Sequence, residues 1–118
     1  MYGVPKDLDL SRFRGDSLIQ IAIGEFQIQF HFGSRSSIAV EGDWELKDQS
    51  GKLIDRDMEN SARESYHIHH LLGRTVLTTK LDPPKSISLH FDNGMTLTIL
   101  DSSNQFESFS VQPGNIIV

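Results

Sequence analysis

Histidine is the residue type in this 118-residue chain whose spacing best fits site chemistry, and the chain has five of them. His67 and His70 stand three positions apart, which on a helix places both imidazoles on one face, at a spacing that suits a metal ligand pair. No carboxylate stands at the fixed offset of a known metalloprotease motif. A solvated histidine cluster is therefore the broader interpretation, a ligand-binding or metal-binding edge is the sharper one, and we assign no metal ion or cofactor.

His31 and His90 occupy matching places in two similar segments of the chain. Each alternates out of phase with its apolar neighbours, which places it on the outward face of a strand. A twofold axis between the segments could bring the two side chains together, whereas the simpler interpretation is a half-exposed strand residue. Six residues thus form a candidate ligand site for a nucleotide-like molecule: His31, His90, Tyr66, His67, His70 and Arg74.

Acidic residues gather in the middle of the chain, whose net charge is −5. Between residues 41 and 59 acids outnumber bases, and the single tryptophan lies among them. This stretch is either a solvated connector or a patch that attracts a basic partner. If Trp44 is an exposed anchor rather than a core residue, the partner-binding candidates are Trp44, Asp43, Glu45 and Asp48.

Several activities lack the residues that they need. The chain has no cysteine, which excludes disulfides, thiolate ligands and cysteine nucleophiles. It contains no G-x-S-x-G elbow, P-loop or G-x-G-x-x-G motif. Its acidic balance argues against binding to a nucleic-acid backbone. An enzyme is therefore the third-ranked class, and metal-dependent hydrolysis through the histidines is the form that fits best.

A repeated pattern of apolar residues organises the fold. Segment 13–40 and segment 71–99 share a glycine (Gly15, Gly73) and two strands with alternating apolar residues. We expect α+β architecture, mostly antiparallel β, in which two pseudo-symmetric three-stranded repeats form a curved sheet or partly open barrel. One domain spans 1–118, with a connector at 43–72.

The local signals place the individual elements. Alternation or turn residues predict strands at 17–23, 26–32, 37–41, 75–81, 86–91, 95–100, 106–111 and 115–118, and a small hairpin at 44–54. In the strand 26–32, Phe26 is expected to face inward with Ile28. Ser61 and Glu64 form a capping-box pattern, which predicts one helix at 61–72 between the repeats.

The chain resembles an uncharacterised family of small bacterial domains. The resemblance rests on Gly24, Gln27, Glu41 and the segments 4–10 (VPKDLDL), 18–21 (LIQI), 44–46 (WEL) and 105–109 (QFESF). It implies no activity, and no functional residue is carried over from it.

These observations favour a non-enzymatic, acidic protein-binding module of immunity-like or inhibitor-like type, acting on a basic partner. The alternative is a small-molecule binder or sponge for a nucleotide-like signal. We expect a cytoplasmic protein, because it has neither an apolar run long enough to span a bilayer nor a secretion signal. An edge strand or the acidic hairpin could also pair two copies into a homodimer.

Overall fold

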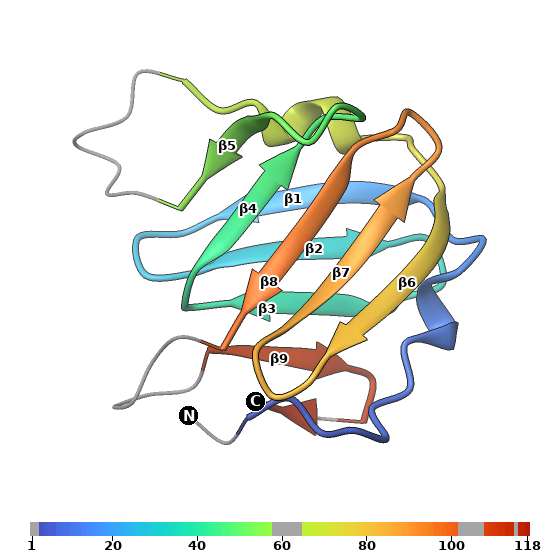
Figure 1. The fold of residues 1–118 in the computed structure, drawn as a ribbon, viewed down its shortest axis with the longest axis vertical. Helices are drawn as coiled ribbons and strands as arrows, with labels where there is room; N and C mark the ends of the chain where they lie inside the picture. The colour runs from blue at the N-terminus through green and yellow to red at the C-terminus, as the bar shows by residue number, and fades with distance from the viewer. Residues whose placement is uncertain (1–2, 58–64, 102–107, 115) are drawn as a thin grey trace.

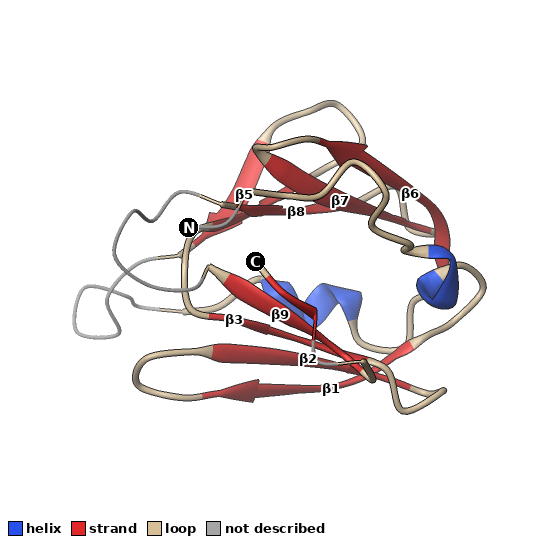
Figure 2. Ribbon diagram, turned by 90° about the horizontal axis from the view of Figure 1, so that it is seen from below, coloured by secondary structure: helices blue, strands red, loops and turns tan. Residues whose placement is uncertain are grey.

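Two five-stranded antiparallel sheets, packed face to face, make up the described part of the protein. The structure is a computed structural model that describes residues 3–57, 65–101, 108–114 and 116–118. Sheet 1 has the strand order β1 (Leu18–Ile23), β2 (Ile28–Phe32), β3 (Ser37–Val40), β9 (Phe109–Gln112) and β10 (Ile116–Ile117). Sheet 2 has the order β5 (Leu53–Arg56), β4 (Trp44–Lys47), β8 (Thr96–Leu100), β7 (Ser86–Phe91) and β6 (Val76–Asp82). Figure 2 shows the two layers from the side.

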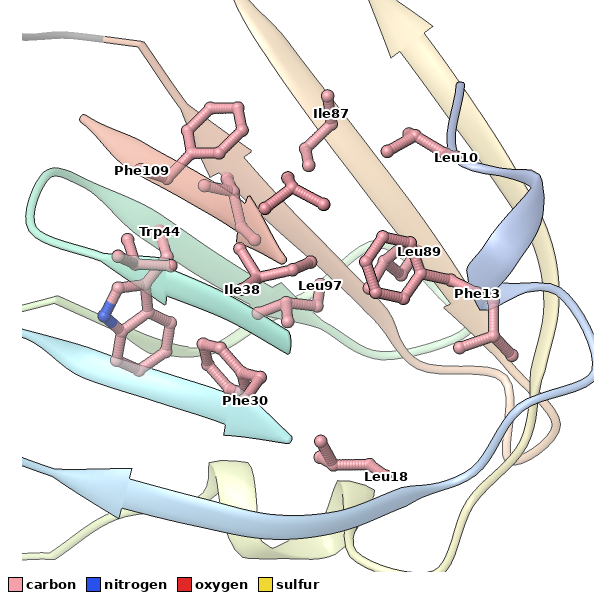
Figure 3. Packing of buried hydrophobic residues seen from close by; sticks show 14 of the residues in the cluster. Leu10, Phe13, Leu18, Phe30, Ile38, Trp44, Ile87, Leu89, Leu97 and Phe109 are labelled. Atoms are coloured by element: carbon pink, nitrogen blue, oxygen red, sulfur yellow. The ribbon is translucent and has the colours of Figure 1, made fainter. Parts of the chain in front are cut away.

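Alternating side chains explain why the sheets stack. In β2, Ile28, Phe30 and Phe32 are buried, while Gln29 and His31 are half-buried on the other face. Since successive strand residues point to opposite faces, each central strand sends every second side chain between the sheets. Figure 3 shows the packed interior, where each large apolar side chain contributes about 1.5–3 kcal/mol on burial.

Each sheet consists of three successive strands of the chain, β1–β3 or β6–β8, and two further strands that do not follow or precede them directly in the same sheet by a hairpin. The short link at 41–43 carries the chain from β3 in sheet 1 to β4 in sheet 2, where Trp44 pairs with Ile99. In the same way β9 returns to sheet 1, where Phe109 pairs with Val40. The prediction of one curved sheet or partly open barrel is therefore wrong in arrangement, because this exchange of strands builds two separate sheets. The prediction of a mostly antiparallel β protein is confirmed.

The predicted helix at 61–72 is not formed in its described part. Residues 61–64, with Ser61 and Glu64 of the capping box, lie outside the described residues, and 65–67 have no helical assignment. Only a short 3₁₀ turn, η3 (Ile68–Leu71), follows, in which the His70 amide donates to the His67 carbonyl. Within the described residues, no helix is long and apolar enough to cross a membrane.

The residues just before β1 and β6, which are edge strands of the two sheets, meet at one point. Ser17 and Thr75 form an isolated antiparallel bridge, and their hydroxyl oxygens lie 3.0 Å apart. The Gly15 amide donates to the Val76 carbonyl at 2.8 Å, and the Gly73 amide donates to the Leu18 carbonyl at 2.8 Å. These contacts tie the 3₁₀ turn η1 (Ser11–Phe13) and the turn η3 to opposite strands of the junction.

Candidate functional site

An exposed aromatic residue and a group of carboxylates lie at one end of the sandwich. Ile28 pairs with both Ile23 and Val40, so the β1–β2 turn (24–27) and the β3–β4 link (41–43) lie at the same end. Phe26 in that turn is 80% exposed. We call this region the acidic end and define it by Phe26, Glu41, Asp43 and Asp57.

Two carboxyl groups of the acidic end are in contact. Asp57 follows β5, and its amide donates to the Trp44 carbonyl at 3.1 Å. The Trp44 amide donates to Asp57 Oδ1 at 3.2 Å, which holds the carboxyl beside Asp43. Partial burial, followed by a hydrogen bond with the Asp43 carboxyl and the charge of Asp43, raises the pKa of Asp57. A cation placed between these two groups would lower their mutual repulsion.

The predicted anchor Trp44 is not on the surface. Its side chain is only 4% exposed, and Figure 3 shows it among the residues that fill the space between the sheets. Trp44 pairs with Ile99 at an inward-facing position, where its large apolar area is removed from water. Trp44 is therefore a core residue, and its role as a partner-binding anchor is wrong.

The other predicted partner-binding residues have different surroundings. Asp43 is exposed at the acidic end. Glu45 is half-buried on β4, where its carboxylate lies 3.8 Å from Lys47 Nζ. Asp48 folds back on its own turn, since Oδ1 accepts hydrogen bonds from the Ser50 hydroxyl at 2.6 Å and the Lys52 amide at 3.0 Å. Asp43 alone joins the acidic end from this set.

His31 and His90 are not brought together. His31 lies on the outer face of sheet 1, with Nε2 3.0 Å from Gln29 Oε1. His90 lies on the outer face of sheet 2, with Nδ1 2.9 Å from Thr96 Oγ1. Because the inner faces of the sheets pack against each other, the two outer faces point in opposite directions. A paired histidine site is therefore not formed.

The remaining ligand-site candidates lie along one connecting segment. Tyr66 packs partly against the core, whereas His67, His70 and Arg74 are exposed. The His67 and His70 rings are nearly parallel, with centroids 6.4 Å apart, and the His69 ring lies 4.2 Å from that of His70. Within the described part of the chain, no group of three or more histidine or acidic side chains could hold a metal ion. Ligand binding by this segment stays a prediction.

The sequence did not predict the surroundings of two residues, Phe26 in the β1–β2 turn and Asp55 on β5. Phe26 was expected to face inward, but β2 begins only at Ile28, so Phe26 belongs to the exposed turn. Asp55 is only 7% exposed, and its Oδ2 accepts the amides of His67 at 2.7 Å and Ile68 at 3.2 Å. The carboxylate thus holds the start of η3, and no local pattern around β5 signals this long-range contact.

Comparison with known proteins finds no relative for this chain: no family model, no curated protein and no solved structure matches it. The resemblance to a family of small bacterial domains stays a prediction.

Proposed function

We propose that this protein is a non-enzymatic binding module that engages a basic protein partner through its acidic end. The observation that supports this most is the 80% exposure of Phe26, beside a link that carries Glu41 and Asp43. A large aromatic side chain left in water is a common anchor for a partner, and an acidic rim selects the sign of the partner's charge.

Two energetic terms favour such a partner. Covering the Phe26 side chain would contribute about 1.5–3 kcal/mol from the hydrophobic effect. Burial raises the pKa of Asp57, and the neighbouring Asp43 carboxyl raises it further. A lysine or arginine of the partner near Asp43 and Asp57 would offset the repulsion between the two carboxylates. The partner surface that fits is therefore an apolar pocket or side chain flanked by basic residues.

The test uses a defined probe. A lysine-rich peptide with one central leucine is titrated into the protein by calorimetry, beside a peptide of equal charge in which glycine replaces leucine. We expect the leucine peptide to bind more tightly, with an affinity that falls as salt is added. Phe26→Ala should weaken that binding about tenfold, which corresponds to 1.4 kcal/mol.

A matched variant controls for exposed apolar area in general. Leu77 on β6 is 59% exposed and lies in the other sheet. Leu77→Ala should leave the affinity unchanged, and Asp43→Asn should weaken binding and reduce its dependence on salt. Equal losses in Phe26→Ala and Leu77→Ala, or no loss in either variant, would contradict the proposal.

We also propose that the two sheets derive from an internal repeat with pseudo-twofold symmetry. Three observations support this. The 3₁₀ turn η1 precedes β1 as η3 precedes β6. The bulges in β1 and β6 fall at corresponding residues, Ile19 and Leu77. Strands β4 and β5 complete sheet 2 as β9 and β10 complete sheet 1.

An immunity-like or inhibitor-like role fits a binding module of this kind, because such proteins act by covering a partner's surface. This step is analogy rather than geometry. A cytoplasmic location belongs to the same proposal, since a chain without cysteine fits a compartment where disulfides are rare.

A further inference from the structure

In the part of the chain that the structure describes, no strand of sheet 1 carries a charged residue. Aspartate, glutamate, lysine and arginine are absent from β1, β2, β3, β9 and β10. In sheet 2 they occur on β4, β5 and β6. In a chain that is 23% charged, this contrast sets one whole sheet apart. Two copies, each with a net charge of −5, meet the least mutual repulsion there.

Strand β1 is the long free edge of this uncharged sheet. Among the described strands it pairs with β2 alone, and only Ser17, just before it, makes a bridge to Thr75. At the opposite edge, the described residues of β10 are Ile116–Ile117. In β1, Ile19 is 61% and Ile23 is 49% exposed. Long apolar edges without charge readily accept another strand, and proteins that avoid this pairing usually place lysine on the edge.

The backbone of β1 offers its hydrogen-bonding groups at defined residues. The Gly24 amide bonds to the Gln27 carbonyl, on the β2 side. Because the direction alternates along an antiparallel strand, Ala22 also faces β2, whereas Ile21 and Ile23 direct their amides and carbonyls outward. At the other end of the strand, the Leu18 amide donates to the Arg74 carbonyl, so the open edge begins after Leu18.

The sequence of this edge is complementary to itself. Antiparallel pairing of two β1 strands about Ile21 places Ile21 opposite its own copy, Ile19 opposite Ile23, and Gln20 opposite Ala22. Every isoleucine of the strand thus meets another isoleucine, and no charge is buried. The same register places Glu25 in the turn of each copy opposite Ser17 of the other copy, whose bridge partner Thr75 directly follows Arg74. Glu25 and Arg74 are both exposed. This pairing of opposite charges favours a second copy over an unrelated strand.

We infer that two copies of this chain form a symmetric dimer by pairing their β1 strands about Ile21, which joins the two copies of sheet 1 into one continuous sheet. This inference does not rest on the proposed function, since it uses neither Phe26 nor the carboxylates of the acidic end. Strand β6, at the corresponding edge of sheet 2, carries Lys80 and Asp82 and is not the pairing edge.

The first test fixes both the edge and the register. The chain has no cysteine, so one introduced cysteine can form only an intermolecular disulfide. In a hydrogen-bonded antiparallel pair the Cα atoms lie about 5.5 Å apart, within disulfide reach. Ile21→Cys should give a covalent dimer on mild oxidation. Thr79→Cys, at the corresponding position of β6 by its pairing opposite Leu89, should give no covalent dimer.

The second test uses a substitution that the fold already tolerates elsewhere. The position in β6 that corresponds to Ala22 is Lys80, as their pairings with Gln29 and Ser88 show. At a dilution where both proteins are monomeric, Ala22→Lys should leave the melting temperature unchanged. It should raise the dimer dissociation constant about tenfold or more, because it places two lysines diagonally across the pair. Lys80→Ala is the control and should leave dimerisation unchanged.

A third comparison tests the ion pair. Glu25→Arg and Arg74→Glu should each weaken the dimer, and the double variant should restore it. The mass of the wild-type protein is measured by light scattering across about a hundredfold dilution, and should approach twice 13.3 kDa at the concentrated end. A monomer at every concentration overturns the inference. So does a dimer that survives Ala22→Lys, or one that crosslinks through Thr79→Cys.

Discussion

Trp44 and Asp57 exchange hydrogen bonds: the Trp44 amide donates to Asp57 Oδ1 at 3.2 Å, and the Asp57 amide donates to the Trp44 carbonyl at 3.1 Å. The pair links the start of β4 to the residue that follows β5. The Trp44 ring lies in the core between the sheets, and the Asp57 carboxyl lies against Asp43. The Trp44–Asp57 pair therefore connects a residue of the hydrophobic core to the carboxylates of the acidic end.

Asp57→Asn should stabilise the protein at neutral pH. Partial burial and the neighbouring Asp43 carboxyl raise the pKa of Asp57 above 3.8. The folded state then binds the proton more tightly than the unfolded state. The contribution of this group to stability is therefore present at low pH, falls as the pH rises from about 3.8 through the raised pKa of the folded state, and is lost above it. Asparagine keeps an oxygen for the Trp44 amide and can donate to Asp43. Thermal unfolding of both proteins across pH should show a gain that disappears below about pH 3.8.

Asp48 supplies the control of opposite sign. The Ser50 hydroxyl, and then the Lys52 amide, lower the pKa of Asp48, because both donate to its carboxylate. Its contribution is therefore present above the unfolded pKa and is lost as the pH falls through the folded pKa. Asp48→Asn should destabilise the protein most at neutral pH. Parallel pH curves for Asp57→Asn and Asp48→Asn would contradict the assigned pKa directions.

The two aromatic residues near the acidic end should respond very differently to truncation. Trp44→Ala removes a buried ring and should cost about 3–5 kcal/mol of unfolding free energy. Phe26→Ala removes an exposed ring and should change stability by no more than about 0.5 kcal/mol. Urea denaturation of both variants measures the difference. A large loss for Phe26→Ala would mean that the β1–β2 turn is packed rather than available to a partner.

Phe26 shows what the local alternation of apolar residues can and cannot predict. Alternation placed β2 and β7 within two residues of their observed starts, because strand period is a property of neighbouring residues. Phe26 alternates in phase with Ile28 and was expected inside, but the strand begins two residues later. Alternation gives the phase of a strand and does not say where the partner strand stops.

Long-range arrangement was less accessible from the sequence. Three residues, 41–43, connect β3 in sheet 1 to β4 in sheet 2. Their composition does not indicate which sheet β4 joins. The alternative in which His31 meets His90 depended on a twofold axis between the two segments of one curved sheet, so it failed together with that arrangement. The simpler interpretation, a half-exposed strand residue, fits both histidines. Asp43 was found because charge gathers locally in sequence, whereas its contact with Asp57 arises only from the pairing of β4 with β5.

Asp55 should be one of the most sensitive charged positions. Its carboxylate is buried and accepts the amides of His67, Ile68 and Arg56. Asp55→Ala leaves these donors without that acceptor and should cost about 3 kcal/mol, because buried N–H groups lose their water and gain no partner. Asp55→Asn replaces one oxygen and should cost less. Hydrogen exchange should speed up at His67 and Ile68 in both variants, and unchanged protection there would refute this role.

Gly15 and Gly73 test the proposed internal repeat. Both have left-handed backbone angles, with φ of 80° and 79°, and no atom within 4 Å of an added Cβ. Alanine at either position therefore meets only the cost of that conformation, about 1–2 kcal/mol. If the two turns are equivalent, Gly15→Ala and Gly73→Ala should lose similar unfolding free energy. Their amides donate to opposite strands of one junction, so the double variant should lose a different amount from the sum of the single losses. Unequal single losses that add exactly would argue for two independent turns and against a symmetric junction.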